Sequence, residues 1–505
     1  MKKFIVSAIA AMLFFSVPAF AYVMPGDADG NGKLEITDAA EILRCTAKVN
    51  IADYSAERRL AMDFDHDGAI GVRDAIGVLD WLDAPAIDES KVVTDFSSLK
   101  NALGKNQSTI YVRGKIECTA RLDLKTQNAE VSIIGLKDAN GQNAVLDFAK
   151  MRDSLTSASS SNTGVYIQGT GYTFENLIIQ NAGDCGVRIK GSSAGNSTFK
   201  NCVFRYNNNS GVSITEGGHD NEFYNCDSYR NGDILQKGGS DADGFSVKLA
   251  AAGENYFYNC RAWENSDDGW DSYRKSGKSG MPIIKYIECL AWNNGNPEVF
   301  TGEYDYAQGL PLDKNLIYVQ AILKNDPDFE TKYNAHTVTE WPKVDMQLLG
   351  ITKGYEELYS TWEGNPNGFK FGSGNSGSDE YRYIENCIAF DHVGNSNIPK
   401  GKGFDQNSAS GLVYDLKNIL AFNNVVNVNM SSMKANSVGG VVWAFDKAAA
   451  LDGKTYGESA GSSLKETTPS NKDEIKTKVY AYRDMICDYV YNGMIPGERI
   501  CDVFE

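Results

Sequence analysis

A short motif recurs through the middle of the chain and restricts what the chain can fold into. An aromatic or aliphatic residue stands two positions before the centre of the motif. Asn or Glu holds the centre, mostly at intervals of 24 to 34 residues: Asn176, Asn201, Asn225, Asn259, Glu288, Asn386 and Asn418. In five copies a cysteine follows: Cys202, Cys226, Cys260, Cys289 and Cys387. A fixed register with variable loops is typical of a solenoid whose repeats stack on their neighbours.

The repeat predicts an all-β fold, a right-handed parallel β-helix. Short apolar runs separated by Gly and Asn make each repeat a set of short strands, and stacking places one rung about every 4.8 Å. The five cysteines then share one inward column, where we expect free thiols that pack as small hydrophobic side chains, not metal ligands or nucleophiles. The Asn column is expected to form an amide ladder at the turns.

A further strand in each repeat opens with glycine, as in Gly244-Phe245-Ser246. The apolar residue after the glycine is expected to point inward. Because strand residues alternate between faces, the next residue should point to solvent in every rung. This outward column consists of Arg188, Ser213, Ser246, Asp271, Lys370 and Asp405.

Acidic residues gather in two consecutive turns before these strands. Asp243 and Asp268 are in register, so we expect them about 4.8 Å apart. Asp267 lies beside them in the turn, and Asp271 follows on the strand. Four carboxylates within one or two rungs cannot all be ionised unless a cation compensates them, and oxygen donors at this density suit Ca²⁺. The alternative is a solvated acidic surface.

Lys370 should lie one rung beyond Asp271, although 99 residues separate them in the sequence. The separation arises because residues 296–364 form a long insertion that leaves the helix at one turn. A cation beside bound Ca²⁺ should have a lowered pKa, which would make Lys370 usable as a base. The alternatives are a surface lysine without a role and, as the base, Lys248 near Asp243.

Calcium, a lysine base and an extended groove together indicate β-elimination on a polyuronate. A uronate carboxylate bound to Ca²⁺ loses charge, which acidifies its C5 proton; Lys370 would remove that proton while the C4–O bond breaks. Calcium would also let an acidic protein bind a polyanion such as pectate. The net charge is −17, or −19 once Lys2 and Lys3 are removed with residues 1–21. This charge argues against non-specific nucleic-acid binding.

Four strings resemble family 9 of the polysaccharide lyases: SDADGF at 240–245, CRAWENSDDGWD at 260–271, NGFK at 367–370 and GFDQN at 403–407. The resemblance covers residues 95–431 and implies a parallel β-helix that cleaves pectate. It implies Asp243, Asp267, Asp268 and Asp271 as calcium ligands and Lys370 as the base, the same assignment that the register predicts. The insertion 296–364 is longer than the family's pattern. Three cations, Arg274, Lys275 and Lys278, are candidates for contacts with substrate carboxylates, with a solvated basic turn as the alternative.

Two other functions stay open. Pectin hydrolases also use β-helices with clustered Asp, and an inverting glycoside hydrolase would need one protonated carboxyl group and an activated water, with no required metal. A non-catalytic carbohydrate-binding β-helix would tolerate Lys370→Ala without losing its activity. The lysine in register and the four-carboxylate cluster favour the lyase.

Residues 24–84 contain a duplicated calcium loop. Each loop has oxygen donors at positions 1, 3, 5 and 12 and Gly at position 6, the pattern of EF-hand loops. The predicted ligands are Asp27, Asp29, Asn31 and Asp38 in the first loop and Asp63, Asp65, Asp67 and Asp74 in the second. Leu34 and Ile70 at position 8 should pack the loops together. Short amphipathic helices are expected at 39–45 and 75–82, with Ile42, Leu43, Ile76, Val78 and Leu79 as apolar residues.

A duplicated loop-helix with Asp at position 12 resembles the dockerin module of cellulosomal enzymes. The resemblance implies two calcium ions and docking onto a cohesin domain of a scaffold protein. It also implies that helix-start residues select the cohesin; here these are Thr37, Asp38, Arg73 and Asp74, which differ between the two halves. The alternative is a purely structural calcium module.

The ends of the chain complete the expected organisation. Lys2 and Lys3, a short apolar run and Ala19-Phe20-Ala21 predict a signal peptide at 1–21, with a membrane anchor as the alternative. We therefore expect a secreted, extracellular protein associated with a cellulosome, with a linker at 85–94, no later membrane span and a monomeric catalytic domain. Residues 432–505 should cap the helix, with a helical stretch at 480–491, and Cys487 and Cys501 could form a disulfide.

Overall fold

The computed structural model describes two compact units, residues 1–89 and 90–505, each with its own core. The described residues are 26–31, 33–47, 54–64, 70–83, 87–105, 107–126, 130–138, 142–152, 160–274, 282–342, 362–372, 380–393, 401–409, 411–448 and 464–504. The expected signal peptide lies outside them. Within these ranges, no helix combines the length and hydrophobicity needed to span a bilayer.

The N-terminal unit contains three helices, α1 (Ile36–Ala47), α2 (Ala56–Met62) and α3 (Val72–Asp83). Leu34 is buried and Ile70 packs against the same core, as predicted. The two expected amphipathic helices exist, but their apolar residues divide. Ile42 and Val78 are buried, whereas Leu43, Ile76 and Leu79 are exposed.

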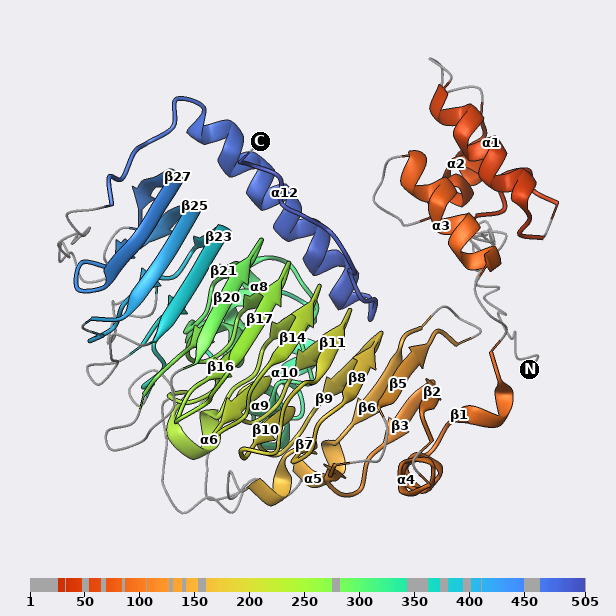
Figure 1. Cartoon of the computed structure of the whole chain (residues 1–505), viewed down its shortest axis with the longest axis horizontal. Helices are drawn as coiled ribbons and strands as arrows, with labels where there is room; N and C mark the ends of the chain where they lie inside the picture. Colours follow the sequence, from red (N-terminus) through yellow and green to blue (C-terminus); the bar gives the residue numbers. More distant parts are fainter. Residues whose placement is uncertain are drawn as a thin grey trace, which may run out of the picture. The chain divides into compact units, whose positions relative to one another are not determined.

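The second unit is a parallel β-helix, which confirms the predicted fold class (Figure 1). Most rungs supply two strands to an 18-stranded sheet and one strand to a 9-stranded sheet. The first strands of these rungs are β1 (Val92–Val93), β2 (Thr109–Arg113), β5 (Val131–Leu136), β8 (Tyr172–Glu175), β11 (Thr198–Lys200), β14 (Asn221–Tyr224), β17 (Glu254–Tyr258) and β20 (Ile283–Ile287). In the later rungs one long strand takes both places: β23 (Tyr381–Phe390), β25 (Val413–Asn424) and β27 (Lys434–Lys447). The second strands are β3 (Lys115–Glu117), β6 (Ala144–Asp147), β9 (Leu177–Gln180), β12 (Val203–Arg205), β15 (Asp227–Tyr229), β18 (Arg261–Trp263) and β21 (Leu290–Trp292). The smaller sheet contains β4 (Leu122–Leu124), β7 (Val165–Ile167), β10 (Val187–Lys190), β13 (Val212–Thr215), β16 (Phe245–Val247), β19 (Trp270–Asp271), β22 (Asn367–Lys370), β24 (Lys402–Asp405) and β26 (Val426–Asn429).

The Asn column marks the bend between the first two strands of each rung. All seven motif centres have a positive φ between 48° and 60°, a left-handed conformation that Asn tolerates better than most residues. The amide ladder is confirmed: Asn201 Nδ2 donates to Asn176 Oδ1 at 3.1 Å, and Asn225 Nδ2 donates to Asn201 Oδ1 at 3.2 Å. The five cysteines beside the ladder are free and buried, also as predicted.

Aromatic columns fill the core and both follow the predicted register. Phe174, Phe199 and Phe223 stack with ring centroids 4.9 and 4.8 Å apart. In the smaller sheet Trp270 stacks on Phe369 at 4.6 Å. Each rung is thereby held at the spacing of a β-ladder.

A second polar ladder, not predicted, runs inside the turn after the second strand. Asn231 Nδ2 donates to Asn265 Oδ1 at 2.9 Å, and Asn265 Nδ2 to Asn294 Oδ1 at 3.0 Å. In the next rung His392 takes the Asn position: its Nδ1 lies 2.9 Å from Asn424 Oδ1 and its Nε2 lies 3.2 Å from Asn294 Nδ2. This arrangement needs neutral imidazole, with Nδ1–H donating and Nε2 accepting.

His392 should make the β-helix less stable in acid. Burial lowers the pKa of His392 to about 4, so the native state resists the proton that the unfolded chain accepts below about pH 6.5. Neutral His392 therefore leaves the free energy of unfolding unchanged above that pH. As the pH drops towards 4, the free energy of unfolding should fall by at most about 3 kcal/mol because of this residue. His392→Asn places asparagine in the ladder again and should remove the acid-induced loss of stability that is due to His392. Denaturant unfolding of both proteins at pH 7 and pH 4.5 measures this difference. Equal pH sensitivity of the two proteins would contradict a buried, neutral His392 as the cause.

The stack of rungs extends further than residue 431. Strand β27 pairs in parallel with β25. Helix α4 (Phe96–Gly104) lies at the N-terminal end of the stack, and Asp95 and Ser98 form a capping box at its first turn. The predicted C-terminal helix is present as α12 (Lys472–Tyr491), but it lies along the side of the coil rather than across its end (Figure 1). Tyr480 of α12 packs on Phe390 and Phe422 of the second-strand column. Cys487 and Cys501 are free, so the suggested disulfide is wrong.

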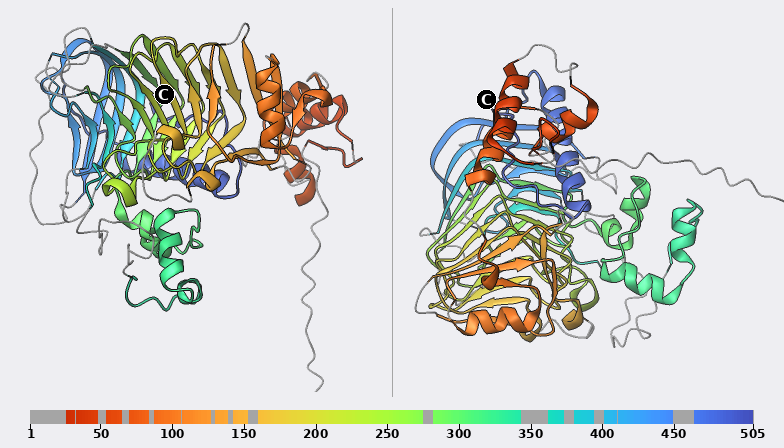
Figure 2. Two further views of the ribbon diagram at one scale, coloured as in Figure 1. Left: turned by 90° about the horizontal axis from the view of Figure 1, so that it is seen from below. Right: turned by 90° about the vertical axis from the view of Figure 1, so that its right-hand side faces the viewer.

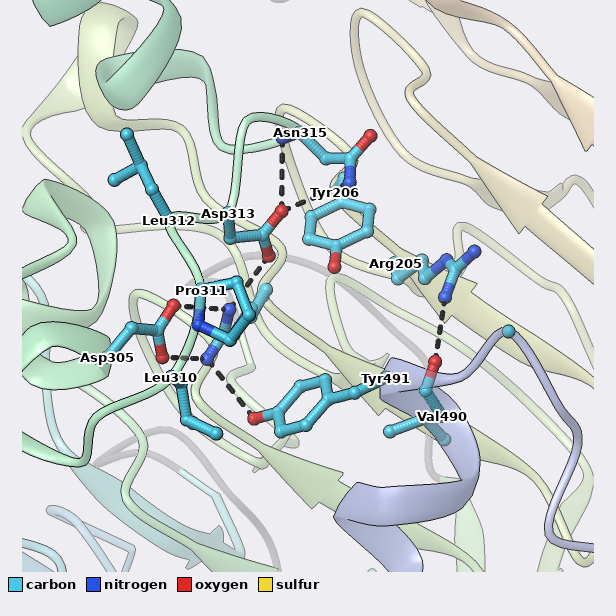
Figure 3. A pocket seen from close by; sticks show the side chains of 12 residues that line it. Arg205, Tyr206, Asp305, Leu310, Pro311, Leu312, Asp313, Asn315, Val490 and Tyr491 are labelled. Atoms are coloured by element: carbon cyan, nitrogen blue, oxygen red, sulfur yellow. Dashed lines mark hydrogen bonds and ion pairs between the residues drawn. The ribbon is translucent and has the colours of Figure 1, made fainter. Parts of the chain in front are cut away.

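The insertion after β21 is helical and projects from one side of the coil (Figure 2). It contains α7 (Pro297–Thr301), α8 (Glu303–Ala307), α9 (Ile317–Asn325) and α10 (Phe329–Asn334). A buried ion-pair cluster fastens it to the coil. Arg230 lies 2.6 Å from Asp305 and 2.7 Å from Asp313, both in the insertion, and 2.7 Å from Glu264 in the next rung. Tyr491 of α12 accepts a further hydrogen bond from Arg230 at 3.1 Å, at the edge of a cavity of about 280 Å³ (Figure 3).

Candidate active site

The outer face of the smaller sheet brings the predicted acidic and basic residues together. Strands β16, β19 and β22 pair in parallel, with Ser246 opposite Asp271 and Asp271 opposite Lys370. The predicted one-rung distance between Asp271 and Lys370 is therefore confirmed. It arises because the insertion interrupts the sequence of the rung but not the ladder.

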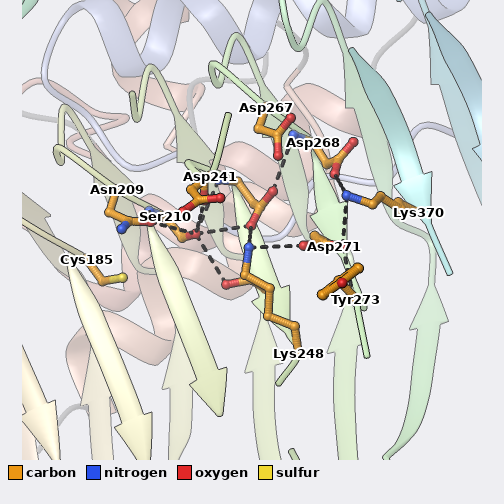
Figure 4. Close-up of polar contacts among 12 residues, drawn as sticks. Cys185, Asn209, Ser210, Asp241, Lys248, Asp267, Asp268, Asp271, Tyr273 and Lys370 are labelled. Atoms are coloured by element: carbon orange, nitrogen blue, oxygen red, sulfur yellow. Dashed lines mark hydrogen bonds and ion pairs between the residues drawn. The ribbon is translucent and has the colours of Figure 1, made fainter. Parts of the chain in front are cut away.

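Two lysines and four carboxylates form one cluster (Figure 4). Lys370 Nζ lies 2.8 Å from Asp268 Oδ2 and 3.3 Å from Asp271 Oδ1. Lys248 Nζ lies 2.7 Å from Asp243 Oδ2 and 3.0 Å from Asp271 Oδ2. Asp271 thus bridges the two lysines. With all groups ionised, the cluster carries two more negative than positive charges.

Three of the four predicted metal ligands form a compact oxygen cage. Asp243, Asp267 and Asp268 each offer a carboxylate oxygen, and these three atoms lie within 4.8 Å of one another. Asp271 does not belong to this cage, because its two oxygens face the lysines. The cage has the hard oxygen donors that a divalent cation such as Ca²⁺ prefers.

Most of the outward column is buried, which corrects the expectation that its members are exposed to solvent; of its six residues, Arg188 is partly exposed. Asp271 is 3% exposed, Lys370 8% and Ser246 1%. These side chains do point away from the core. The insertion's return segment nevertheless reaches the acidic turns: the Asn365 N–H donates to Asp267 Oδ1 at 2.6 Å, and Trp362 contacts the turn at Gly239.

Burial controls the ionisation of the carboxylates. It raises the pKa of Asp268 to about 8 and also raises the pKa values of Asp243 and Asp267. Asp271 behaves differently: burial alone would raise its pKa, but Lys370 and Lys248 together hold it below its usual value. The cage therefore favours binding a proton or a cation.

Among the groups of the protein itself, the carboxylates set the pKa of Lys370. Burial would lower it, but Asp268 and Asp271 together raise it well above its usual value, since each carboxylate favours the ammonium form. The lowered pKa expected beside bound Ca²⁺ stays a prediction.

Three residues that hold the cage were not predicted. Ser210 Oγ donates to Asp243 Oδ2 at 3.2 Å, Asn367 Nδ2 donates to Asp268 Oδ1 at 2.7 Å, and Asn365 donates through its backbone. Ser210 and Asn367 each stand directly before the glycine of the strand motif, the position of Asp243 and Asp268. The aligned repeats therefore contained the signal for these two residues, whereas no repeat includes Asn365.

Asn367→Ala should weaken cation binding by about ten- to a hundredfold, because second-sphere hydrogen bonds orient carboxylate ligands. Asn365→Ala is the matched control, since this residue uses its backbone N–H, which alanine keeps. Calorimetric titration of both variants with Ca²⁺ measures the difference. Equal affinities in the two variants would show that the Asn367 amide does not position Asp268.

The candidate substrate-binding cations are only partly placed. Arg274 forms an ion pair with Glu380 at 3.1 Å. Lys275 and Lys278 lie outside the described residues.

The first loop of the N-terminal unit forms a second oxygen cluster. Carboxylate oxygens of Asp27, Asp29 and Asp38 lie within 4.8 Å of one another, while the Asn31 side chain donates to Asp29 Oδ2 and accepts from Lys33 N–H. In the second loop Asp63 and Asp74 are described and Asp65 and Asp67 are not. The two halves share one detail: Asp38 accepts from Glu35 N–H and Asp74 from Gly71 N–H, at 2.7 and 2.6 Å.

The proposed cohesin-selecting positions differ in exposure. Thr37 is exposed, whereas Asp38 and Asp74 are buried. Arg73 lies in α3, and the described residues do not include its side chain. Neither Asp38 nor Asp74 is therefore exposed at the surface of the described part of this unit.

Known proteins are similar to this chain over its β-helix. Residues 87–309 match the model of the Pel9A-like right-handed β-helix region. Pectate lyase L of Paenibacillus polymyxa is 27% identical over 315 residues, covering 60% of this chain and 64% of that protein. Pectate lyase L of Dickeya chrysanthemi is 30% identical over 303 residues, covering 60% and 52%.

The matched part of the chain thus spans about half to two thirds of the length of these two relatives. The crystal structure of pectate lyase Pel9A aligns with a TM-score of 0.46 at 23% identity, over 74% of this chain and 76% of that one. Over its β-helix, this chain is therefore similar to pectate lyases and carries a Pel9A-like right-handed β-helix region.

Proposed function

We propose that the β-helix unit is a secreted, calcium-dependent lyase that cleaves pectate by β-elimination. The observation that carries this proposal is the place of Lys370, whose Nζ lies 2.8 Å from Asp268 and 3.3 Å from Asp271 beside the oxygen cage. A lysine can take a proton from carbon once it is neutral. The similarity to pectate lyases supports pectate as the substrate.

The oxygen cage fits calcium by the chemistry of its donors. Asp243, Asp267 and Asp268 would hold the ion, and Asp271 would orient the lysines beside it. When bound, Ca²⁺ would neutralise a substrate carboxylate and make the adjacent C5–H more acidic. The excess of two negative charges in the cluster equals the charge of one such ion.

Lys370 then acts as the base. It accepts the C5 proton, the electrons of the C5–H bond form a C4–C5 double bond, and the C4–O bond breaks. The leaving oxygen takes a proton from solvent. Asp268 and Asp271 hold Nζ in place. Their negative charge raises the pKa of Lys370, and a bound cation that compensates this charge would lower the pKa again.

A glycoside hydrolase remains the second candidate, and one observation favours it. The pKa of Asp268, raised by burial to about 8, would suit a general acid that donates a proton near neutral pH. In that reaction water, not a lysine, would attack the sugar.

The mass of the products distinguishes the two reactions. Hydrolysis adds one water at each cleaved bond, whereas elimination adds none. Mass spectrometry of polygalacturonate cleavage products should therefore show new ends that are lighter by one water than a saturated oligosaccharide, because they carry the C4–C5 double bond. Saturated products alone would replace the lyase by the hydrolase.

We also propose that the N-terminal unit is a dockerin that binds calcium and docks onto a cohesin, as part of a cellulosome. Two observations support it. The first loop gathers three carboxylates, and α1 and α3 expose apolar residues at equivalent places: Ile36 and Leu43 in one, Val72 and Leu79 in the other. Exposed apolar residues of this kind mark protein interfaces. The basic and apolar residues at 1–21 support export.

Asp38→Ala should weaken calcium binding by the first loop by at least about tenfold, because position 12 contributes charge as well as an oxygen ligand. In this variant the helix content of the unit should reach its full value only at a higher calcium concentration. Thr37→Ala is the matched control, since Thr37 is exposed beside it. Circular dichroism during a calcium titration of the N-terminal unit measures both. Unchanged midpoints in Asp38→Ala would argue against a calcium loop.

A further inference from the structure

A groove lined by tyrosines lies on the larger sheet of the β-helix, whereas the acidic cluster lies on the smaller sheet. It follows the outward positions of the first strands β11, β14 and β17. Pairing places Lys200 beside Tyr224, Tyr224 beside Tyr258, and Glu222 beside Tyr256. In Figure 1 this face of the strands is turned to the viewer, and none of the described helices of the unit crosses it.

The groove has a volume of about 580 Å³. Its lining combines three partly exposed tyrosines with polar and charged side chains: Thr173, Thr198, Lys200, Asn201, Glu222, Tyr224, Asn225, Tyr256, Tyr258 and Glu498. The ring of Tyr224 lies 5.5 Å from that of Tyr256 and 6.4 Å from that of Tyr258, with tilts of 53° and 54°. The rings therefore form one surface over two rungs and leave part of each face open.

Its chemistry is that of a sugar-binding surface. Apolar sugar faces pack on aromatic rings, while sugar hydroxyls need donors and acceptors nearby, and the groove offers both. The Asn201 and Asn225 amides and the Thr173 and Thr198 hydroxyls border the rings. These groups recur with the rungs, about every 4.8 Å, a period comparable to one sugar unit of an extended chain.

The charge of the groove selects an uncharged chain. Among the described residues that line it, Lys200 is the one cation, against Glu222 and Glu498. Glu222 accepts a hydrogen bond from the Tyr224 hydroxyl at 3.2 Å, and burial raises the pKa of Tyr256 to about 12. The tyrosines thus remain neutral donors, and the net negative charge would repel pectate. The occupant expected here differs from the substrate of the acidic cluster.

We propose that this tyrosine groove is a second, non-catalytic site that binds an uncharged polysaccharide chain. It lies on the large sheet, whereas the acidic cluster lies on the small one. Such a site would hold the protein on neutral polymers while the other face acts on a uronate polymer. The inference stands on the groove alone and does not require the proposed lyase reaction.

Affinity electrophoresis of the full chain through gels containing hydroxyethylcellulose, linear galactan or polygalacturonate tests the proposal. At least one neutral polymer should retard the chain, and Tyr256→Ala with Tyr258→Ala should weaken that binding by about tenfold per ring. Tyr111→Ala, on the same face but outside the groove, is the matched control and should bind like the unaltered chain. Lys370→Ala should also bind normally. Thermal unfolding checks that each variant is folded.

Three outcomes would overturn the proposal. The first is that neither neutral polymer retards the chain. The second is that the double variant binds as well as the Tyr111→Ala control. The third is that Lys370→Ala abolishes binding to the neutral polymer, which would assign the binding to the acidic cluster. If the double alanine variant fails to fold, Tyr258→Gln, which keeps a long side chain over the sheet, carries the same test with a loss of about tenfold.

Discussion

Lys370→Ala should lower the rate of pectate cleavage by roughly 10²- to 10⁴-fold, the usual contribution of a general base. Lys370→Arg should be as inactive, although it keeps the charge, because a guanidinium does not lose its proton in proteins. Initial rates at saturating calcium measure both. Since Asp268 and Asp271 raise the Lys370 pKa, the unaltered enzyme should gain activity as pH rises, and added calcium should shift this rise to lower pH.

Lys248→Ala is the matched control for that experiment. Lys248 is the other lysine of the cluster, 2.7 Å from Asp243 and 3.0 Å from Asp271. Its removal should reduce activity less than the removal of Lys370, since it is assigned no proton transfer. Loss of activity in Lys248→Ala with activity retained in Lys370→Ala would exchange the two roles. Activity in Lys370→Arg would exclude Lys370 as the base.

Removing calcium should abolish the activity of the β-helix unit, and Asp243→Asn should lower its calcium affinity by about a hundredfold or more. Affinity depends strongly on the number of charged ligands, and Asp243 is one of three carboxylates in the cage. The experiment uses residues 90–505, because a chelator would also act on the proposed loops of the N-terminal unit. Rates across a calcium titration give the apparent affinity.

Asp241→Asn provides the comparison in the same turn. Asp241 pairs with Lys237, is partly exposed and does not belong to the oxygen cage, so its replacement should leave the calcium affinity unchanged. High calcium should restore most of the rate in Asp243→Asn. Full activity of the unaltered unit in chelator would contradict a metal-assisted reaction.

The acidic cluster was predictable because the β-helix converts sequence period into distance. Aligning one glycine per rung was enough to place Asp243, Asp268 and Lys370 in neighbouring rungs. The same alignment indicated the buried cysteines and the Asn ladder. Ser210 and Asn367 occupied aligned positions too, but small polar residues give no strong chemical signal on their own.

Features outside the repeat were not predictable in this way. Nothing in the register indicates that Asn365 reaches Asp267, that Arg230 fastens the insertion, or that α12 lies along the coil. The raised pKa of Lys370 also depends on exact distances to Asp268 and Asp271 rather than on rung order.

The central claim is β-elimination by Lys370 with calcium, and ultraviolet absorbance tests it most directly. Elimination leaves an unsaturated sugar that absorbs, whereas hydrolysis does not. Polygalacturonate incubated with residues 90–505 should gain absorbance with calcium, and should gain none with chelator or with Lys370→Ala. New reducing ends without a rise in absorbance would contradict the account.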